Sequence, residues 1–133
     1  MAMADGVGVP IAVHAASASP HELTLVEATL VRGFVSQPPA RLIGDKAYDS
    51  DPLDQRLVAK AIRLIAAHRG NRTRLLTQDG RALRGYRQRW QIERLLAWLH
   101  NFRRLVTRYE HHVENFLGFV HLGCMLIILR THF

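Results

Sequence analysis

Residues 86–110 read YRQRWQIERLLAWLHNFRRLVTRYE, and the interpretation of the rest of the chain depends on this stretch. Its apolar residues recur at the spacing of a helix, and it contains no Gly or Pro that would break one. On a helical projection these apolar residues share one broad side, which predicts a surface that faces the core. The members of this predicted core face are Ile92, Leu95, Leu96, Leu99, Phe102 and Val106.

A second side of the same predicted helix carries one acid, Glu93, among cations. By pattern alone, such a stripe is usually a solvated face with ordinary ion pairs four residues apart, for example Arg89 with Glu93. A functional interpretation therefore needs a further signal. The residues within about 40° of Glu93 on the helical projection are Tyr86, Arg89, Ala97, His100 and Arg104.

Positive charge is concentrated in the same part of the chain. The 133 residues carry a formal net charge of +7, and residues 69–108 contain eleven Arg against only Asp79 and Glu93, a local balance of +9. Aromatic residues are interleaved with these arginines, which is the pattern expected of a surface that binds a polyanion such as DNA. A basic face that is merely solvated is the alternative. The aromatic residues are Tyr86, Trp90, Trp98, Phe102 and Tyr109.

The overall composition indicates a folded protein of the cytoplasm. With 48% apolar residues the chain can bury a core, and its length predicts a single domain over residues 1–133. Cys124 is the only cysteine, which excludes a disulfide framework and predicts a buried thiol. Residues 1–5 do not resemble a signal peptide. The longest apolar run, residues 116–129, is shorter than the ~20 residues of a membrane span, so we expect a buried C-terminal helix and no membrane partner.

Local patterns along the chain predict an α/β fold. The sequence DGVG at residues 5–8 predicts a hairpin turn before a strand, and Ser19 is a candidate cap for the helix that follows. In the middle of the chain, a strand, a helix that starts near Asp51-Pro52 and a second strand predict a parallel βαβ unit. The predicted strands cover residues 10–16, 41–44 and 62–66, the helices 21–34, 53–61, 81–108 and 115–130, and the main loop 68–80.

Residues 44–51, GDKAYDSD, place three acids directly after a predicted strand. Asp45 follows the strand at once, and the carboxyl ends of α/β strands border the crevice in which such sheets bind ligands. Asp49 and Asp51 have structural explanations, as a turn residue and as a helix cap. By itself this segment is a weak signal for a site.

Two segments together resemble one protein family. Tyr86, Arg89 and Glu93 resemble the Y-R-E signature of DDE transposases from bacterial insertion sequences of the four/five grouping. The segment GDKAYD is similar to the one that carries the family's second catalytic Asp, which maps onto Asp45. The resemblance covers nearly the whole chain, because residues 10–30 and 114–130 are also similar to the family.

The resemblance implies an incomplete RNase H-like fold, with a short mixed or parallel sheet, flanking helices and long C-terminal helices. It also implies cleavage and strand transfer of DNA with Mg²⁺ or Mn²⁺, for which Asp45 and Glu93 would be catalytic residues and metal ligands. Such in-line displacements at phosphorus use metal ions held by hard carboxylate oxygens. The expected partners are transposon ends and target DNA, and the expected location is the cytoplasm.

The resemblance also assigns a set of DNA-binding residues. Arg89 would contact phosphate near the metal, and Tyr86 would orient that arginine. His100 stands where the family often has Lys, so its contact with phosphate departs from the family pattern. Arg103, Arg104 and Arg108 are expected to bind the DNA backbone rather than to read bases.

The family's third carboxylate has no clear match. It belongs to the first strand of the fold, tens of residues before the hairpin, whereas Asp5 lies in the predicted hairpin turn and is only a minor candidate. We therefore expect a C-terminal part of a transposase that is inactive or nearly so alone, with a homodimer or an N-terminal transposase half as partner. The alternatives are a non-enzymatic DNA-binding or regulatory protein derived from a transposase, and a decayed gene product that folds poorly.

Overall fold

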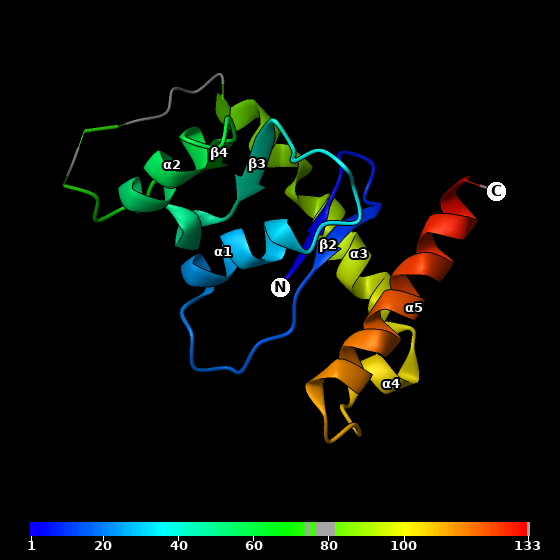
Figure 1. Cartoon of the computed structure of the whole chain (residues 1–133). Coiled ribbons are helices and arrows are strands. Elements are labelled where there is room, and N and C mark those ends of the chain that lie inside the picture. Colours follow the sequence, from blue (N-terminus) through cyan, green and yellow to red (C-terminus); the bar gives the residue numbers. More distant parts are fainter. Residues whose placement is uncertain (74, 77–81, 133) are drawn as a thin grey trace. The chain divides into compact units, whose positions relative to one another are not determined.

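The computed structural model describes residues 1–73, 75–76 and 82–132 (Figure 1). These described residues form two compact units. The terminal unit comprises Met1–Ser36 and Trp90–Phe133, and the central unit comprises Gln37–Arg89. Residue 81, the predicted start of the long helix, lies outside the described residues, as do residues 74 and 77–80 of the predicted loop.

The terminal unit begins with an antiparallel hairpin of β1 (Ala2–Ala4) and β2 (Pro10–Val13). The predicted turn at DGVG is confirmed. Asp5 Oδ1 accepts the N–H groups of Val7 and Val9 at 2.9 and 2.8 Å, and Gly8 has a φ of 85°, which glycine adopts at little cost. The second strand is shorter than predicted, although His14, directly after it, still exchanges backbone hydrogen bonds with Met1 at 2.9 and 2.7 Å.

Helix α1 (Glu22–Val31) starts and ends at residues other than those predicted. The cap is His21 rather than Ser19, since His21 Nδ1 accepts the N–H of Leu23 at 3.3 Å. The predicted helix is also too long at its end. The N–H of Gly33 bonds to the carbonyl of Leu30 and the N–H of Phe34 to Ile11 at 2.7 Å, so the chain leaves the helix to meet β2.

The long helix predicted over residues 81–108 is divided into three pieces. The 3₁₀ segment η2 (Ala82–Arg89) belongs to the central unit, and α3 (Trp90–His100) and α4 (Arg103–Val106) belong to the terminal unit. Between α3 and α4 the N–H of Phe102 bonds to the carbonyl of Leu99 at 3.0 Å, and Phe102 has an extended backbone.

Packing on the last helix accounts for the break after α3. Helix α5 (Val113–His132) carries Gly123, where an added Cβ would lie within 3.3 Å of the side chains of Leu99, Phe102 and Leu105. The turn thus brings residues from both α3 and α4 onto the bare backbone of α5. Tertiary packing here overrides a local sequence that has no helix breaker.

The core of the terminal unit joins the hairpin to α3 and α5. Its buried members are Val13, Leu95, Leu99, Cys124 and Ile127, so the predicted burial of Cys124 is confirmed. Burial of apolar area on this scale supplies most of the stabilisation, at about 25 cal/mol per Å².

The predicted core face of residues 92–106 is correct only in part. Ile92 and Phe102 pack against this core, but Leu96 and Val106 are exposed. Leu96 lies beside the narrow buried stripe, and the break after His100 moves Val106 away from it.

Helix α5 is buried along one side only, so the prediction of a buried C-terminal helix is wrong for its other side. Its 20 residues exceed the predicted apolar run, and by length and composition it is apolar enough to cross a membrane. A single such helix is weak evidence for a membrane location, because core helices of soluble proteins pass the same test. The exposed apolar residues of α5 are Leu122, Met125, Leu126 and Leu129.

The central unit contains the predicted parallel βαβ arrangement. Strands β3 (Arg41–Gly44) and β4 (Arg63–Ala66) pair in parallel, and the register runs from Arg41 opposite Arg63 to Gly44 opposite Ala66. Helix α2 (Asp51–Val58) connects them and buries Leu53 and Leu57 completely. Its cap residue is Ser50, and Asp51 is the first helical residue rather than the predicted cap. The α/β fold class is therefore confirmed.

Candidate active site and DNA-binding residues

Asp45 lies at the carboxyl end of β3, where the chain enters the 3₁₀ turn η1 (Lys46–Tyr48). Its Oδ1 accepts the N–H of Ala47 at 2.7 Å, and its backbone carbonyl accepts the N–H of Tyr48 at 3.1 Å. The side chain is half-buried. One carboxylate oxygen is thereby fixed to the backbone directly after the strand, as expected for a side chain that must be held in one direction.

The glycine before Asp45 has a steric role. A Cβ at Gly44 would lie 2.9 Å from Cδ2 of the Tyr48 ring, closer than side chains pack. The ring of Tyr48 therefore lies on the backbone of the strand end, and only glycine leaves room for it. The spacing of Gly44 and Tyr48 in the sequence carried this signal, but the sequence interpretation did not use it.

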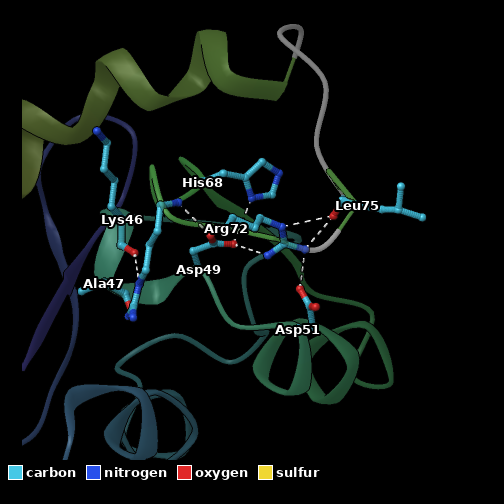
Figure 2. Close-up of polar contacts among 8 residues, drawn as sticks. Lys46, Ala47, Asp49, Asp51, His68, Arg72 and Leu75 are labelled. Atoms are coloured by element: carbon cyan, nitrogen blue, oxygen red, sulfur yellow. Dashed lines mark hydrogen bonds and ion pairs between the residues drawn. The ribbon is translucent and has the colours of Figure 1, made fainter.

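Asp49 is the centre of a buried polar cluster that sequence reasoning missed (Figure 2). Its Oδ1 lies 3.0 Å from His68 Nδ1 and 2.8 Å from Arg72 Nη1, and its Oδ2 accepts the backbone N–H of Arg69 at 2.9 Å. Only 6% of the Asp49 side chain and 9% of the Arg72 side chain are exposed. The predicted role of Asp49 as a turn residue is therefore a small part of what it does.

Two arginines attach the start of the predicted loop 68–80 to the turn after β3 (Figure 2). Arg69 donates from Nε to the carbonyl of Lys46 at 3.1 Å and from Nη2 to that of Ala47 at 2.8 Å. Arg72 donates from Nη2 to Asp51 Oδ1 at 2.7 Å. The described part of this loop is thus tied to residues 46–51 by charge-assisted hydrogen bonds, which are stronger than neutral ones.

The cluster changes the protonation of its members. Burial by itself raises the pKa of Asp49, but the N–H of Arg69, the His68 ring and the Arg72 guanidinium outweigh it and hold that pKa below its ordinary value. The hydrogen bond to Asp51 raises the pKa of Arg72. Asp49 is therefore a carboxylate and Arg72 a cation at neutral pH.

Tyr86 and Arg89 meet on η2, within the central unit. The Arg89 Nη1 donates to the Tyr86 hydroxyl oxygen at 3.2 Å, and the guanidinium carbon lies 5.4 Å from the centre of the Tyr86 ring. The segment lies close to β3, since a Cβ at Gly85 would lie 3.5 Å from Ile43 Cδ1. The arrangement orients Arg89 through its neighbour three residues earlier.

Glu93 lies exposed on α3, in the terminal unit, whereas Asp45 belongs to the central unit. Among residues 1–73, 75–76 and 82–132, no group of three or more His, Cys, Asp or Glu is close enough to hold a metal ion.

Helix α3 is attached to the hairpin turn by contacts that sequence reasoning did not foresee. Arg94 Nη2 donates to the carbonyl of Val7, and its guanidinium carbon lies 4.7 and 4.8 Å from the rings of Trp90 and Trp98. Gln91 Nε2 donates to the carbonyl of Gly6 at 3.0 Å. Residues on both sides of Glu93 therefore fix the helix to the DGVG turn.

The basic residues after α3 differ in their surroundings. His100 and Arg103 are exposed, and neither side chain has a hydrogen bond or ion pair to another described residue. Arg104 instead pairs with Glu110 Oε1 at 3.1 Å, and Arg108 donates to the carbonyl of Glu110 at 3.0 Å. Arg104 and Arg108 therefore already have structural contacts, whereas His100 and Arg103 are available to a partner.

Comparison with known protein families finds a match over nearly the whole chain. Residues 1–129 match the family of the transposase DDE domain. The chain belongs to the DDE transposase family. Members of this family generally use a divalent metal and act on DNA, and they are in general proteins of the cytoplasm.

Two curated relatives are insertion-sequence proteins. The chain is 33% identical over 135 residues to the "Putative transposase for insertion sequence element IS402" of Burkholderia cepacia, which covers 96% of this chain and 60% of that relative. It is 38% identical over 91 residues to the protein named in the same way for element IS6501 of Brucella ovis, over 67% of each. The chain thus spans about 60% of the length of the first relative. No solved structure matches it.

Proposed function

We propose that the chain is the C-terminal part of a transposase catalytic domain of RNase H-like fold, whose whole protein cleaves and joins transposon DNA with Mg²⁺ or Mn²⁺. The observation that carries this proposal is the Asp45 carboxylate, fixed at the carboxyl end of β3 by the Ala47 N–H, in a chain of the DDE transposase family. Strand ends of α/β sheets are where such folds bind ligands.

Asp45 and Glu93 are the proposed catalytic residues and metal ligands. Both offer the hard oxygen donors that Mg²⁺ and Mn²⁺ prefer, and the hydrogen bond to Ala47 engages Oδ1 of Asp45. When bound, the metal would supply Lewis-acid stabilisation of the charge that develops at the reacting phosphate. The protein's part is to hold Asp45 by its turn and to carry Glu93 on a helix attached to the hairpin.

Arg89 is proposed to bind a DNA phosphate, and Tyr86 to orient it. The 3.2 Å hydrogen bond and the contact with the ring limit the directions that the guanidinium can take. A planar guanidinium held in this way suits bidentate phosphate binding.

His100, Arg103, Arg104 and Arg108 are proposed to contact the DNA backbone. Arg103 and His100 are exposed, so they would break no side-chain hydrogen bond or ion pair on binding DNA. Arg104 and Arg108 would have to contact DNA in addition to Glu110. Backbone contacts release counterions, so affinity for DNA should fall steeply with salt.

We further propose that these 133 residues alone do not carry out strand transfer, because only two of the family's three carboxylates have matches in them. Asp5 is the minor candidate for the third carboxylate. Its Oδ1 accepts hydrogen bonds from the N–H groups of Val7 and Val9, which supports its role in the turn. Catalysis would then require an N-terminal transposase half that supplies the missing carboxylate, and a homodimer is the other proposed partner. The proposed location is the cytoplasm.

A DNA-binding protein without catalysis is the second candidate function, and the exposed Arg103 and His100 favour it. It needs neither Asp45 nor Glu93. In both readings the chain binds duplex DNA, and raising salt from 50 to 200 mM should weaken binding about tenfold or more. Isotherms that do not change with salt would contradict both.

Binding of Mn²⁺ separates the two functions. In an NMR titration of the chain with Mn²⁺, we expect paramagnetic broadening of the amide signals of residues 44–48, and its loss in Asp45→Asn. Asp54→Asn, a change on α2 in the same unit, is the matched control and should leave the broadening intact. Equal broadening in Asp45→Asn and the unchanged chain would refute the proposed metal ligand.

A further inference from the structure

We propose that Asp49, Arg69 and Arg72 form a positioning cluster that fixes the direction of the Asp45 carboxylate. This inference rests on the proposed role of Asp45 as a metal ligand. All four residues belong to the central unit, and Figure 2 shows the surroundings of Asp49 and Arg72.

Arg69 and the Asp45 carboxylate are connected through a single peptide group, the one between Lys46 and Ala47. Its N–H donates to Asp45 Oδ1 at 2.7 Å, and its carbonyl accepts from Arg69 Nε at 3.1 Å. A trans peptide is planar and rigid, with its N–H and C=O pointing in opposite directions. The backbone N–H of Asp49 donates to the same Lys46 carbonyl at 3.3 Å. Arg69, together with this longer bond, therefore holds one end of the plane whose other end holds the carboxylate.

The guanidinium of Arg69 acts as a fork, because two of its nitrogens, Nε and Nη2, bind the turn. Its Nη2 donates to the carbonyl of Ala47 at 2.8 Å, so one guanidinium binds two successive carbonyl groups of the turn. Two bonds from one planar group fix an angle as well as a distance. Rotation of the Lys46–Ala47 peptide, which would swing Asp45 Oδ1, must break this pair.

Asp49 in turn anchors Arg69. Asp49 Oδ2 accepts the backbone N–H of Arg69 at 2.9 Å, and its Oδ1 is bound by Arg72 Nη1 at 2.8 Å. Arg72 also binds Asp51 at the start of α2. The Asp49 and Arg72 side chains are nearly excluded from solvent, where such bonds are stronger than at a surface, whereas Arg69 is exposed.

A purely structural role is the competing explanation, in which the cluster only ties residues 68–73 to α2. The two explanations differ at the Arg69 fork. Replacing the side chain of Arg69 leaves its backbone N–H bond to Asp49 intact and removes only the contacts with the carbonyls of Lys46 and Ala47. A structural tie would then survive, but the positioning would be lost.

The experiment compares Arg69→Gln and Arg69→Lys with Arg63→Gln, an exposed arginine on β4 of the same unit. We expect hydrogen exchange of the Ala47 amide to accelerate in Arg69→Gln, and the affinity for Mn²⁺, from broadening at residues 44–48, to fall about tenfold, as for other supports of metal ligands. Arg69→Lys should not rescue either readout, because lysine keeps the charge but lacks the fork. Arg63→Gln should behave as the unchanged chain.

The outcomes separate this inference from the proposed function. If Asp45→Asn leaves Mn²⁺ broadening unchanged, the proposed function fails. If Asp45→Asn abolishes it but Arg69→Gln changes neither Ala47 exchange nor Mn²⁺ affinity, the positioning cluster is wrong and the metal ligand stands. Full rescue of Ala47 exchange and Mn²⁺ affinity by Arg69→Lys would also contradict the positioning cluster. Should Arg69→Gln not fold, Asp49→Asn, which keeps the side-chain volume, decides by the same two readouts.

Discussion

The two proposed metal ligands are held by contrasting means. Asp45 is half-buried in a short turn, and residues about twenty positions later in the sequence brace that turn. Glu93 is exposed on a helix, and the helix is fixed by its core face and by Gln91 and Arg94 on the hairpin turn. The turn after the strand thus has hydrogen bonds on both sides of the Asp45 carboxylate, whereas the place of Glu93 depends on the docking of its helix.

The largest expected effect tests the docking of α3. Leu95 is fully buried in the core of the terminal unit, and Leu96 beside it is exposed. Leu95→Ala should lower the free energy of unfolding by about 2–5 kcal/mol, because it removes buried methyl groups and leaves a cavity. Urea unfolding measures the loss. Leu96→Ala is the matched control, and equal losses for the two variants would mean that α3 does not dock as described.

The turn after β3 is tested at Gly44. Gly44→Ala should cost about 1–3 kcal/mol, because its Cβ would overlap the Tyr48 ring. Urea unfolding measures this cost in two backgrounds. Gly44→Ala should cost less in a chain that already carries Tyr48→Ala than in the unchanged chain. Additive losses would show that the ring does not lie on the strand end.

The hairpin contact of α3 is tested at Gly8. Gly8→Ala should cost about 1–2 kcal/mol, because Gly8 has a φ of 85° and an added Cβ would lie 2.6 Å from Arg94 Nη2. Thermal unfolding followed by circular dichroism measures it. Gly6→Ala, where the Cβ would meet no atom within 4 Å, should change stability much less. A larger effect at Gly6 would contradict the described turn.

A smaller effect is expected from acid in the central unit. The pKa of Asp49 is lowered from its ordinary value of 3.8, so Asp49 contributes stability that is fully present above that value and is lost as pH falls through its folded pKa. Urea midpoints from about pH 6 down to pH 3 should therefore fall more steeply in the unchanged chain than in Asp49→Asn. Asp54→Asn is the control, and a parallel decline in Asp49→Asn and the unchanged chain would show that the cluster does not hold Asp49 ionised.

Local patterns in the sequence were sufficient for the parallel βαβ unit and the hairpin turn. Both depend on short-range signals, namely alternating apolar strands, Pro52 at a helix start and the DGVG turn. The break after His100 was not predictable, because it is caused by Gly123 on another helix and not by a residue in the broken stretch.

The candidate site shows the same limit. Asp45 and the Tyr86–Arg89 pair could be selected from the sequence because their spacing matches a family signature. The Asp49 cluster could not be selected in this way. Its partners His68 and Arg72 are 19 and 23 residues away along the chain, and the sequence around them predicts only a polar loop. Contacts at such separations are set by the fold, which brings β3 and β4 together.

The most direct test of the central claim is anomalous diffraction from a crystal of the chain soaked with Mn²⁺. We predict an anomalous peak at coordination distance, roughly 2.1 Å, from a carboxylate oxygen of Asp45, with the turn after β3 unchanged. A peak only at other carboxylates, with the Asp45 oxygens bound to protein or solvent alone, would contradict it.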